Sequence, residues 1–77
     1  MDLYDYYYQM KKTHRITQKE LAQALGISPI YLSNLLFKRT MPSFQLALKI
    51  EEYTEKKVNA WEFMNSIHEN INKKEKS

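Results

Sequence analysis

The chain has no cysteine, one glycine and two prolines among its 77 residues. Without cysteine, neither a disulfide framework nor a thiolate zinc site can form, and this composition suits a reducing compartment. Because glycine and proline, which favour turns, are so few, the composition predicts an all-helical domain. No stretch is apolar and long enough to cross a bilayer, and the acidic residues that follow Met1 argue against a secretory signal. We therefore expect a cytoplasmic protein that does not contact a membrane.

The small size also argues against catalysis. A chain of 9.3 kDa buries only about 60% of its unfolded surface, which leaves little material to enclose a substrate cleft. The sequence has no phosphate-binding glycine loop and no nucleophile beside a base. His14 and His68 lie far apart, without carboxylates at ligand spacing. We expect no enzymatic activity, no cofactor, no metal site and no small-molecule substrate.

Positive charge is concentrated in the middle of the chain. The net charge is +3, and the isoelectric point is near 9.2. Residues 11–49 hold seven lysines and arginines against Glu20 alone, so this segment carries +6 while the remaining residues carry −3. A solvated surface explains single lysines, but it explains a one-sided segment less well. The distribution favours a polyanionic partner.

Residues that cap the free amides of a first turn mark five helix starts. Thr17 with Glu20 forms a capping box, and Ser28 is followed by Pro29 in the first helical position, which needs no amide proton. The caps Asp2, Thr17, Ser28, Ser43 and Asn59 predict helices over about residues 3–13, 18–25, 29–37, 44–53 and 60–71.

Apolar residues recur at helical spacing along each of these segments, which predicts one core. We expect a compact all-α domain over residues 1–72 and a charged tail over residues 73–77 that frays. The tyrosines of residues 4–8 are interpreted as half-buried helix residues with polar tips. The expected core residues are Leu3, Tyr6, Tyr7, Met10, Leu21, Ala22, Leu25, Leu32, Leu35, Leu36, Phe44, Ala47, Leu48, Ile50, Ala60, Phe63, Met64, Ile67 and Ile71.

The second and third predicted helices are joined only by Gly26 and Ile27 before the Ser28 cap. So short a connection suits the sharp crossing of a helix-turn-helix, and Gly26 supplies the left-handed residue that ends the first helix.

The run TQKELAQALGIS from Thr17 to Ser28 resembles the Cro and phage-repressor type of helix-turn-helix, the Xre family. The likeness continues through Leu32-Ser33, Pro42-Ser43, Ala47, Lys49-Ile50 and Val58, and covers roughly residues 10–64. It implies a lambda-repressor-like five-helix domain that binds double-stranded DNA and regulates transcription.

The chain departs from the family pattern in two loops. Family members commonly carry glycine where this chain has Lys38, and a glycine pair where it has Glu55 and Lys56. We expect these residues to adopt positive φ at a steric cost, unless the preceding helices end differently.

The resemblance implies base contacts from the start of the helix over residues 29–37. It assigns them to Pro29, Ile30, Tyr31 and Asn34. The Asn34 amide can bond an adenine edge and Ile30 can contact a thymine methyl, so we expect an A·T-leaning half-site. Exposed asparagine is also ordinary on any helix, and Tyr31 could instead pack beside the helix over residues 18–25.

Phosphate contacts supply the salt-dependent part of DNA affinity. Gln18 begins a helix, where the dipole favours an anion, and the resemblance places a phosphate contact there too. Ser28 has the alternative role of a cap alone. The full expected set is Gln18, Ser28, Ser33, Lys38, Arg39 and Ser43.

One recognition helix reads only a few base pairs, so we expect a homodimer that reads two half-sites about 34 Å apart. Trp61, with Tyr53 or Ile71, is the expected interface, because aromatic residues dominate such patches. The alternative is that Trp61 is a core residue beneath the first helix.

The leading hypothesis is a sequence-specific transcription regulator. Its rivals are a protein-interaction adaptor with the same fold and the antitoxin of a toxin–antitoxin pair. The adaptor is favoured by the apolar character of Pro29, Ile30, Tyr31 and Phe37. The sequence names neither the operator and regulated genes nor the direction of regulation.

Overall fold

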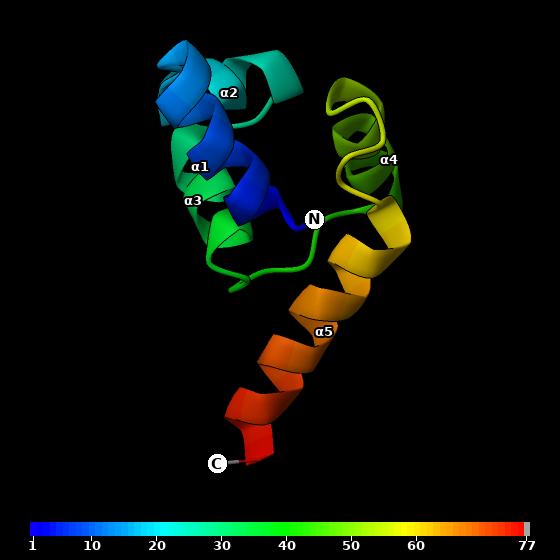
Figure 1. Cartoon of the computed structure of the whole chain (residues 1–77). Helices are drawn as coiled ribbons and strands as arrows, with labels where there is room; N and C mark the ends of the chain where they lie inside the picture. Colours follow the sequence, from blue (N-terminus) through cyan, green and yellow to red (C-terminus); the bar gives the residue numbers. More distant parts are fainter. Residues whose placement is uncertain (77) are drawn as a thin grey trace.

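A computed structural model shows five α-helices and describes residues 1–76, so Ser77, the last residue of the expected tail, lies outside the described residues. The helices are α1 (Leu3–His14), α2 (Gln18–Leu25), α3 (Pro29–Leu36), α4 (Phe44–Tyr53) and α5 (Ala60–Lys76). Residues 1–76 contain no strand. Figure 1 shows α1, α2 and α3 together on one side of the molecule, α4 on the other, and α5 running downward from α4. The expected all-α, five-helix fold is confirmed.

Each helix begins at its predicted cap. The Asp2 carboxylate accepts from the Asp5 amide at 2.9 Å, and Thr17 and Glu20 form the full capping box. The side-chain oxygens of Ser28, Ser43 and Asn59 each accept from the amide three residues ahead, at 3.0–3.1 Å. The first four helices match their predicted spans to within a residue.

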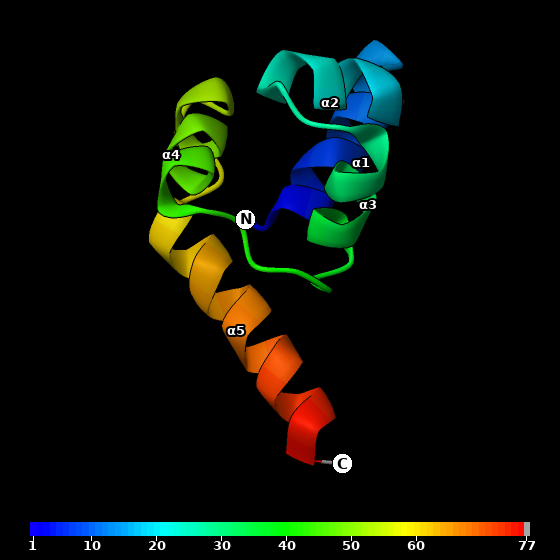
Figure 2. The same cartoon turned by 180° about the vertical axis from the view of Figure 1, so that it is seen from behind.

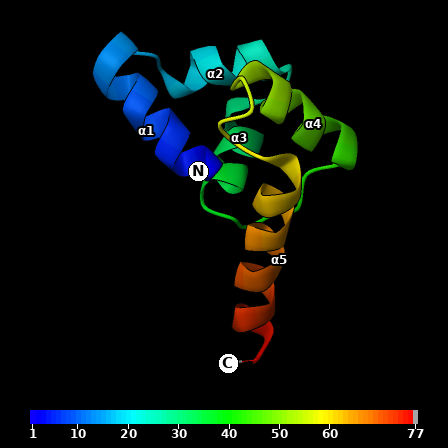
Figure 3. The same cartoon turned by 45° about the vertical axis from the view of Figure 1, so that its right-hand side comes forward.

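The last helix is longer than predicted. α5 continues to Lys76 instead of ending near residue 71, so residues 73–76 of the expected tail are helical. The physical reason is that residues 72–76 contain no glycine or proline, while lysine and glutamate favour helix. Figures 2 and 3 show the end of α5 extending beyond the other helices, and the molecule measures 38 × 20 × 20 Å.

Phe44 and Leu48 were predicted as core residues, and this prediction is wrong: their exposed fractions are 54% and 42%. Ala47 and Ile50 are fully buried and fix the inward face of α4, which leaves Phe44 and Leu48, one turn apart, facing outward. Leu46 packs against the core instead. The buried core cluster is Leu3, Tyr6, Leu21, Ala22, Leu25, Leu32, Leu35, Leu36, Ile50, Val58, Phe63 and Ile67.

Both loops that lack the family glycines turn through the left-handed region. Lys38 has a φ of 58°, and Glu55 and Lys56 have values of 55° and 67°. The expected positive φ is therefore confirmed at all three residues. Arg15, directly after α1, has a φ of 53° that the sequence did not lead us to expect.

Candidate nucleic-acid interface

The turn between α2 and α3 is closed by backbone hydrogen bonds around Gly26. The Gly26 amide donates to the Gln23 carbonyl at 3.1 Å, and the Ile27 amide donates to the Ala22 carbonyl at 3.0 Å. Gly26 has a φ of 72°, a conformation that strains residues with a side chain. The expected left-handed conformation of Gly26 is confirmed, and the turn fixes the crossing of the two helices.

A side-chain contact brings the beginnings of α2 and α3 together. The Gln18 amide nitrogen donates to the Pro29 carbonyl at 3.3 Å. Gln18 is the first residue of α2 and Pro29 the first of α3. The two helix starts therefore lie side by side, and their free amides and dipoles can act on one anionic surface.

The first two residues of α3 are exposed, while the opposite side of the helix is buried. Leu32, Leu35 and Leu36 belong to the core, whereas Pro29 is exposed and Ile30 has an exposed fraction of 77%. This leaves an accessible surface at the start of α3.

The other two residues expected to contact bases are less accessible. Tyr31 and Asn34 are half-buried, and the Tyr31 ring packs against the core. Only part of each side chain is therefore available to a ligand.

The two cap hydroxyls of the expected phosphate set already accept hydrogen bonds. Ser28 accepts from the Tyr31 amide and Ser43 from the Leu46 amide, both at 3.1 Å. A hydroxyl that accepts can still donate its own hydrogen, so capping and phosphate binding are compatible. Ser33 is half-buried, and Ser28 and Ser43 are exposed.

The two cations after α3 have different surroundings. The Lys38 ammonium lies 3.2 Å from the Asp2 carboxylate, and the Lys38 carbonyl accepts from the Asn70 side chain at 3.0 Å. Arg39 is exposed, and its guanidinium carbon lies 5.0 Å from the centre of the Phe37 ring. Arg39 is thus the more accessible cation, while Lys38 must leave Asp2 to reach a phosphate.

The charge on Asp2 is stabilised by its neighbours. Burial acts to raise the pKa of the Asp2 carboxyl, but the Asp5 amide and the Lys38 ammonium outweigh it and lower the pKa below its ordinary value of 3.8. Sequence reasoning identified Asp2 as a cap but missed its pairing with Lys38, because no local pattern connects residues 36 positions apart.

The three residues expected at a dimer interface do not share one environment. Trp61 has an exposed fraction of 67%, so the alternative that it lies in the core beneath α1 is wrong. Tyr53 has an exposed fraction of 38%, and its ring lies at an interplanar angle of 76° to that of Tyr6, with 6.5 Å between the ring centres. Ile71 is partly buried and packs against the core, so Trp61 is the most accessible of the three.

Among the side chains that the structure describes, no group of three or more histidine, aspartate or glutamate residues could hold a metal ion. Across residues 1–76, no helix combines the length and apolar character needed to span a membrane.

Comparison with known proteins gives one positive result. The family model HTH_3, described as "Helix-turn-helix", matches residues 8–61. No match was found among the curated proteins or among the solved structures. The matched residues include α2, α3, α4 and the loops that connect them.

Proposed function

The chain belongs to the HTH_3 family of DNA-binding helix-turn-helix domains, and on this basis we propose that it is a sequence-specific transcriptional regulator of the Cro/repressor type. In this proposal α3 reads the major groove. The observation that carries it is the exposed start of α3, where Ile30 has an exposed fraction of 77%. A hydrogen bond from Gln18 holds Pro29 beside the start of α2.

Base contacts are assigned to Pro29, Ile30, Tyr31 and Asn34. Ile30 presents an apolar surface suited to a thymine methyl, and the Asn34 amide can pair with an adenine edge. Because Tyr31 and Asn34 are half-buried, they contact bases only with the outer parts of their side chains. The half-site that fits this set is rich in A·T pairs.

Phosphate contacts are assigned to residues on both sides of the recognition helix. Arg39 is exposed beside the end of α3, and Lys38 becomes available when it releases Asp2. Arginine and lysine provide the salt-dependent attraction, while hydroxyl and amide donors fix the register on the backbone. The full set is Gln18, Ser28, Ser33, Lys38, Arg39 and Ser43.

Selection of bound sequences from a random duplex pool, followed by a salt series on the selected duplex, tests this function. We expect an A·T-rich consensus and an affinity that falls steeply with salt. Asn34→Ala should relax the preference at one base pair at a cost of about 1–3 kcal/mol. Recovery of no consensus, or a consensus unaffected by Asn34→Ala, would contradict the proposed reading surface.

We also propose that the protein binds DNA as a homodimer through Trp61, with Tyr53 and Ile71 as secondary contacts. An exposed tryptophan is the residue type most enriched at the centre of protein interfaces. Light scattering of the wild type should give twice the chain mass, and Trp61→Ala should shift the population towards monomer. A wild type that remains monomeric on selected DNA excludes this assembly.

The adaptor and the antitoxin remain the alternative functions. The adaptor is favoured by the exposed apolar side chains of Ile30 and Phe37 at 77% and 52%, because exposed apolar groups also mark protein contacts. An adaptor should show no steep salt dependence on duplex DNA, whereas an antitoxin should show it and also bind a partner protein.

A further inference from the structure

Three aromatic rings form a row across α1 and the end of α3. The rings of Tyr8 and Tyr4 lie 6.4 Å apart with an interplanar angle of 8°, and Tyr4 lies 6.0 Å from Phe37. Tyr8, Tyr4 and Phe37 are called the aromatic ladder below. A cation lies at each end of the row. The Lys12 ammonium lies 4.5 Å from the Tyr8 ring centre, and the Arg39 guanidinium carbon lies 5.0 Å from the Phe37 ring centre.

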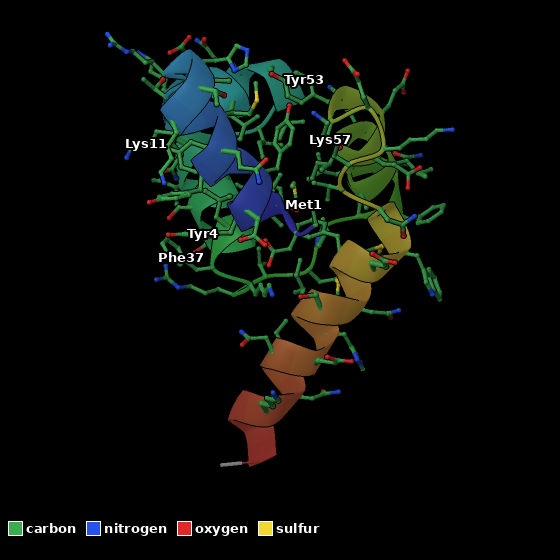
Figure 4. The ribbon with its side chains drawn as sticks, viewed as in Figure 1. Met1, Tyr4, Lys11, Phe37, Tyr53 and Lys57 are labelled. Atoms are coloured by element: carbon green, nitrogen blue, oxygen red, sulfur yellow. The ribbon has the colours of Figure 1, made fainter. Side chains whose placement is uncertain are left out.

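The aromatic ladder is a solvent-exposed surface outside the core. The exposed fractions of Tyr4, Tyr8 and Phe37 are 42%, 48% and 52%. Figure 4 shows Tyr4 and Phe37 next to one another on the side of the molecule away from α4, with Lys11 further along the same side. The interpretation of these tyrosines as half-buried is wrong for Tyr4 and Tyr8, which are exposed. The i, i+4 spacing of Tyr4, Tyr8 and Lys12 is the signal that could have identified the row.

The charge around the ladder favours an anion. Lys11, Lys12 and His14 occupy the last turn of α1, beyond Tyr8, and Arg39 stands at the opposite end. The carboxylate of Asp2 is paired with Lys38, and the first turn of α1 carries one further acidic residue, Asp5. Cations at both ends of an aromatic row complement a ligand that carries anionic groups along its length.

We propose that the aromatic ladder binds a single-stranded segment of nucleic acid, with bases stacked against Tyr8, Tyr4 and Phe37 and phosphates paired with Lys12 and Arg39. Single strands are recognised by this combination of aromatic platforms and flanking cations, and the stacking tolerates any base because every base has a flat face. Arginine over an aromatic ring adds cation–π attraction.

A folded protein partner fits the ladder less well. Protein interfaces owe most of their affinity to side chains that fill well-packed pockets. Two pockets of the described structure are lined by other residues: Met1, Asp2, Glu62 and Phe63 line one, and Ala24, Lys49, Glu52 and Tyr53 line the second. A base that stacks on an exposed ring does not need a pocket.

The ladder meets the proposed duplex interface at Arg39. A single strand that pairs with Arg39 would therefore compete with a duplex phosphate for the same guanidinium. The ladder itself does not depend on α3 reading a base sequence, so the two proposals can fail separately.

The test is fluorescence anisotropy with a labelled 20-nucleotide oligo(dT), an abasic strand of equal length, and a 20-base-pair duplex. Wild type should bind oligo(dT) more tightly than the abasic strand. Tyr4→Ala/Tyr8→Ala should weaken oligo(dT) binding at least tenfold, change abasic binding less than twofold, and leave duplex binding within twofold of wild type. Tyr4→Phe/Tyr8→Phe keeps both rings and should bind oligo(dT) like wild type.

Phe44→Ala is the matched control, because Phe44 is an aromatic residue exposed at 54% on α4, outside the ladder. It should leave oligo(dT) binding unchanged. In wild type, added oligo(dT) should shift the ring-proton NMR signals of Tyr4, Tyr8 and Phe37, a readout that does not require a variant to fold.

The proposal is overturned if oligo(dT) and the abasic strand bind equally, if the double alanine variant binds like wild type, or if Phe44→Ala loses as much affinity. A 20-residue oligo-glutamate peptide that binds with the same dependence on Tyr4 and Tyr8 would also overturn it and assign the ladder to acidic protein segments. Absence of duplex binding with ladder-dependent binding of oligo(dT) would contradict only the proposed regulatory function.

Discussion

The ammonium of Lys38 lies 3.2 Å from the carboxylate of Asp2, so the loop after α3 is tied to the residue that caps α1. The same loop is held from the other side, where Asn70 of α5 donates to the Lys38 carbonyl at 3.0 Å. The segment that presents Arg39 is therefore positioned by both ends of the described chain.

The Asp2–Lys38 pair should make stability depend on pH in the acid range. Because the folded-state pKa of Asp2 lies below its ordinary value of 3.8, the stabilisation is present above that value and is lost as pH falls through the lower folded-state pKa. Asp2→Asn keeps a capping side chain and should lower the free energy of unfolding at about pH 7 by roughly 0.2–1 kcal/mol. Urea unfolding at several pH values measures this, and the variant and wild type should converge once the pH falls below the folded-state pKa of Asp2.

Arg39 should contribute to duplex affinity whatever the sequence. Arg39→Ala should weaken binding to selected and unrelated duplexes alike, and should reduce the slope of log affinity against log salt by about one. Lys56→Ala removes one charge from the loop after α4 and is the control for net charge. A slope equal to that of wild type would remove Arg39 from the interface.

The domain should be more stable with glycine in place of Lys56. Its φ of 67° costs a residue with a side chain about 1–2 kcal/mol, while glycine adopts it freely. After allowance for the greater entropy of glycine in the unfolded chain, Lys56→Gly should stabilise the domain by about 0.5–1 kcal/mol and raise Tm by a few degrees. Lys57→Gly, at a neighbour outside the positive-φ residues, should not stabilise; equal stabilisation by both would contradict the strain argument.

The buried hydroxyl of Thr54 holds the loop between α4 and α5. It donates to the Ile50 carbonyl at 2.8 Å and accepts from the Val58 amide at 3.1 Å, and Thr54 is 1% exposed. Thr54→Val keeps the shape but leaves the Val58 amide without its acceptor, which should cost about 1–3 kcal/mol. Thr54→Ser keeps the hydroxyl and should retain the hydrogen bonds, and thermal unfolding of the two variants separates hydrogen bonding from packing.

Much of the fold was predictable because its signals are local. The Thr17–Glu20 capping box and the left-handed Gly26 each act within a few residues, so the sequence pattern states them directly. The positive φ of Lys38 followed from a missing glycine in the family pattern.

Contacts between distant segments were not predictable in the same way. No pattern in the sequence connects Asp2 with Lys38, or Phe37 with Tyr4. These contacts depend on how α1 crosses the end of α3. Phe44 and Leu48 fit an apolar stripe, yet the inward direction of α4 was decided by Ala47 and Ile50. The assigned base and phosphate contacts stay predictions until a complex is measured.

The attachment of the loop after α3 to Asp2 joins the start of the first helix to a proposed phosphate contact. Fraying of the first turn of α1 would release Lys38 and the loop that carries Arg39. The cations offered to DNA therefore depend on a helix that lies outside the helix-turn-helix itself.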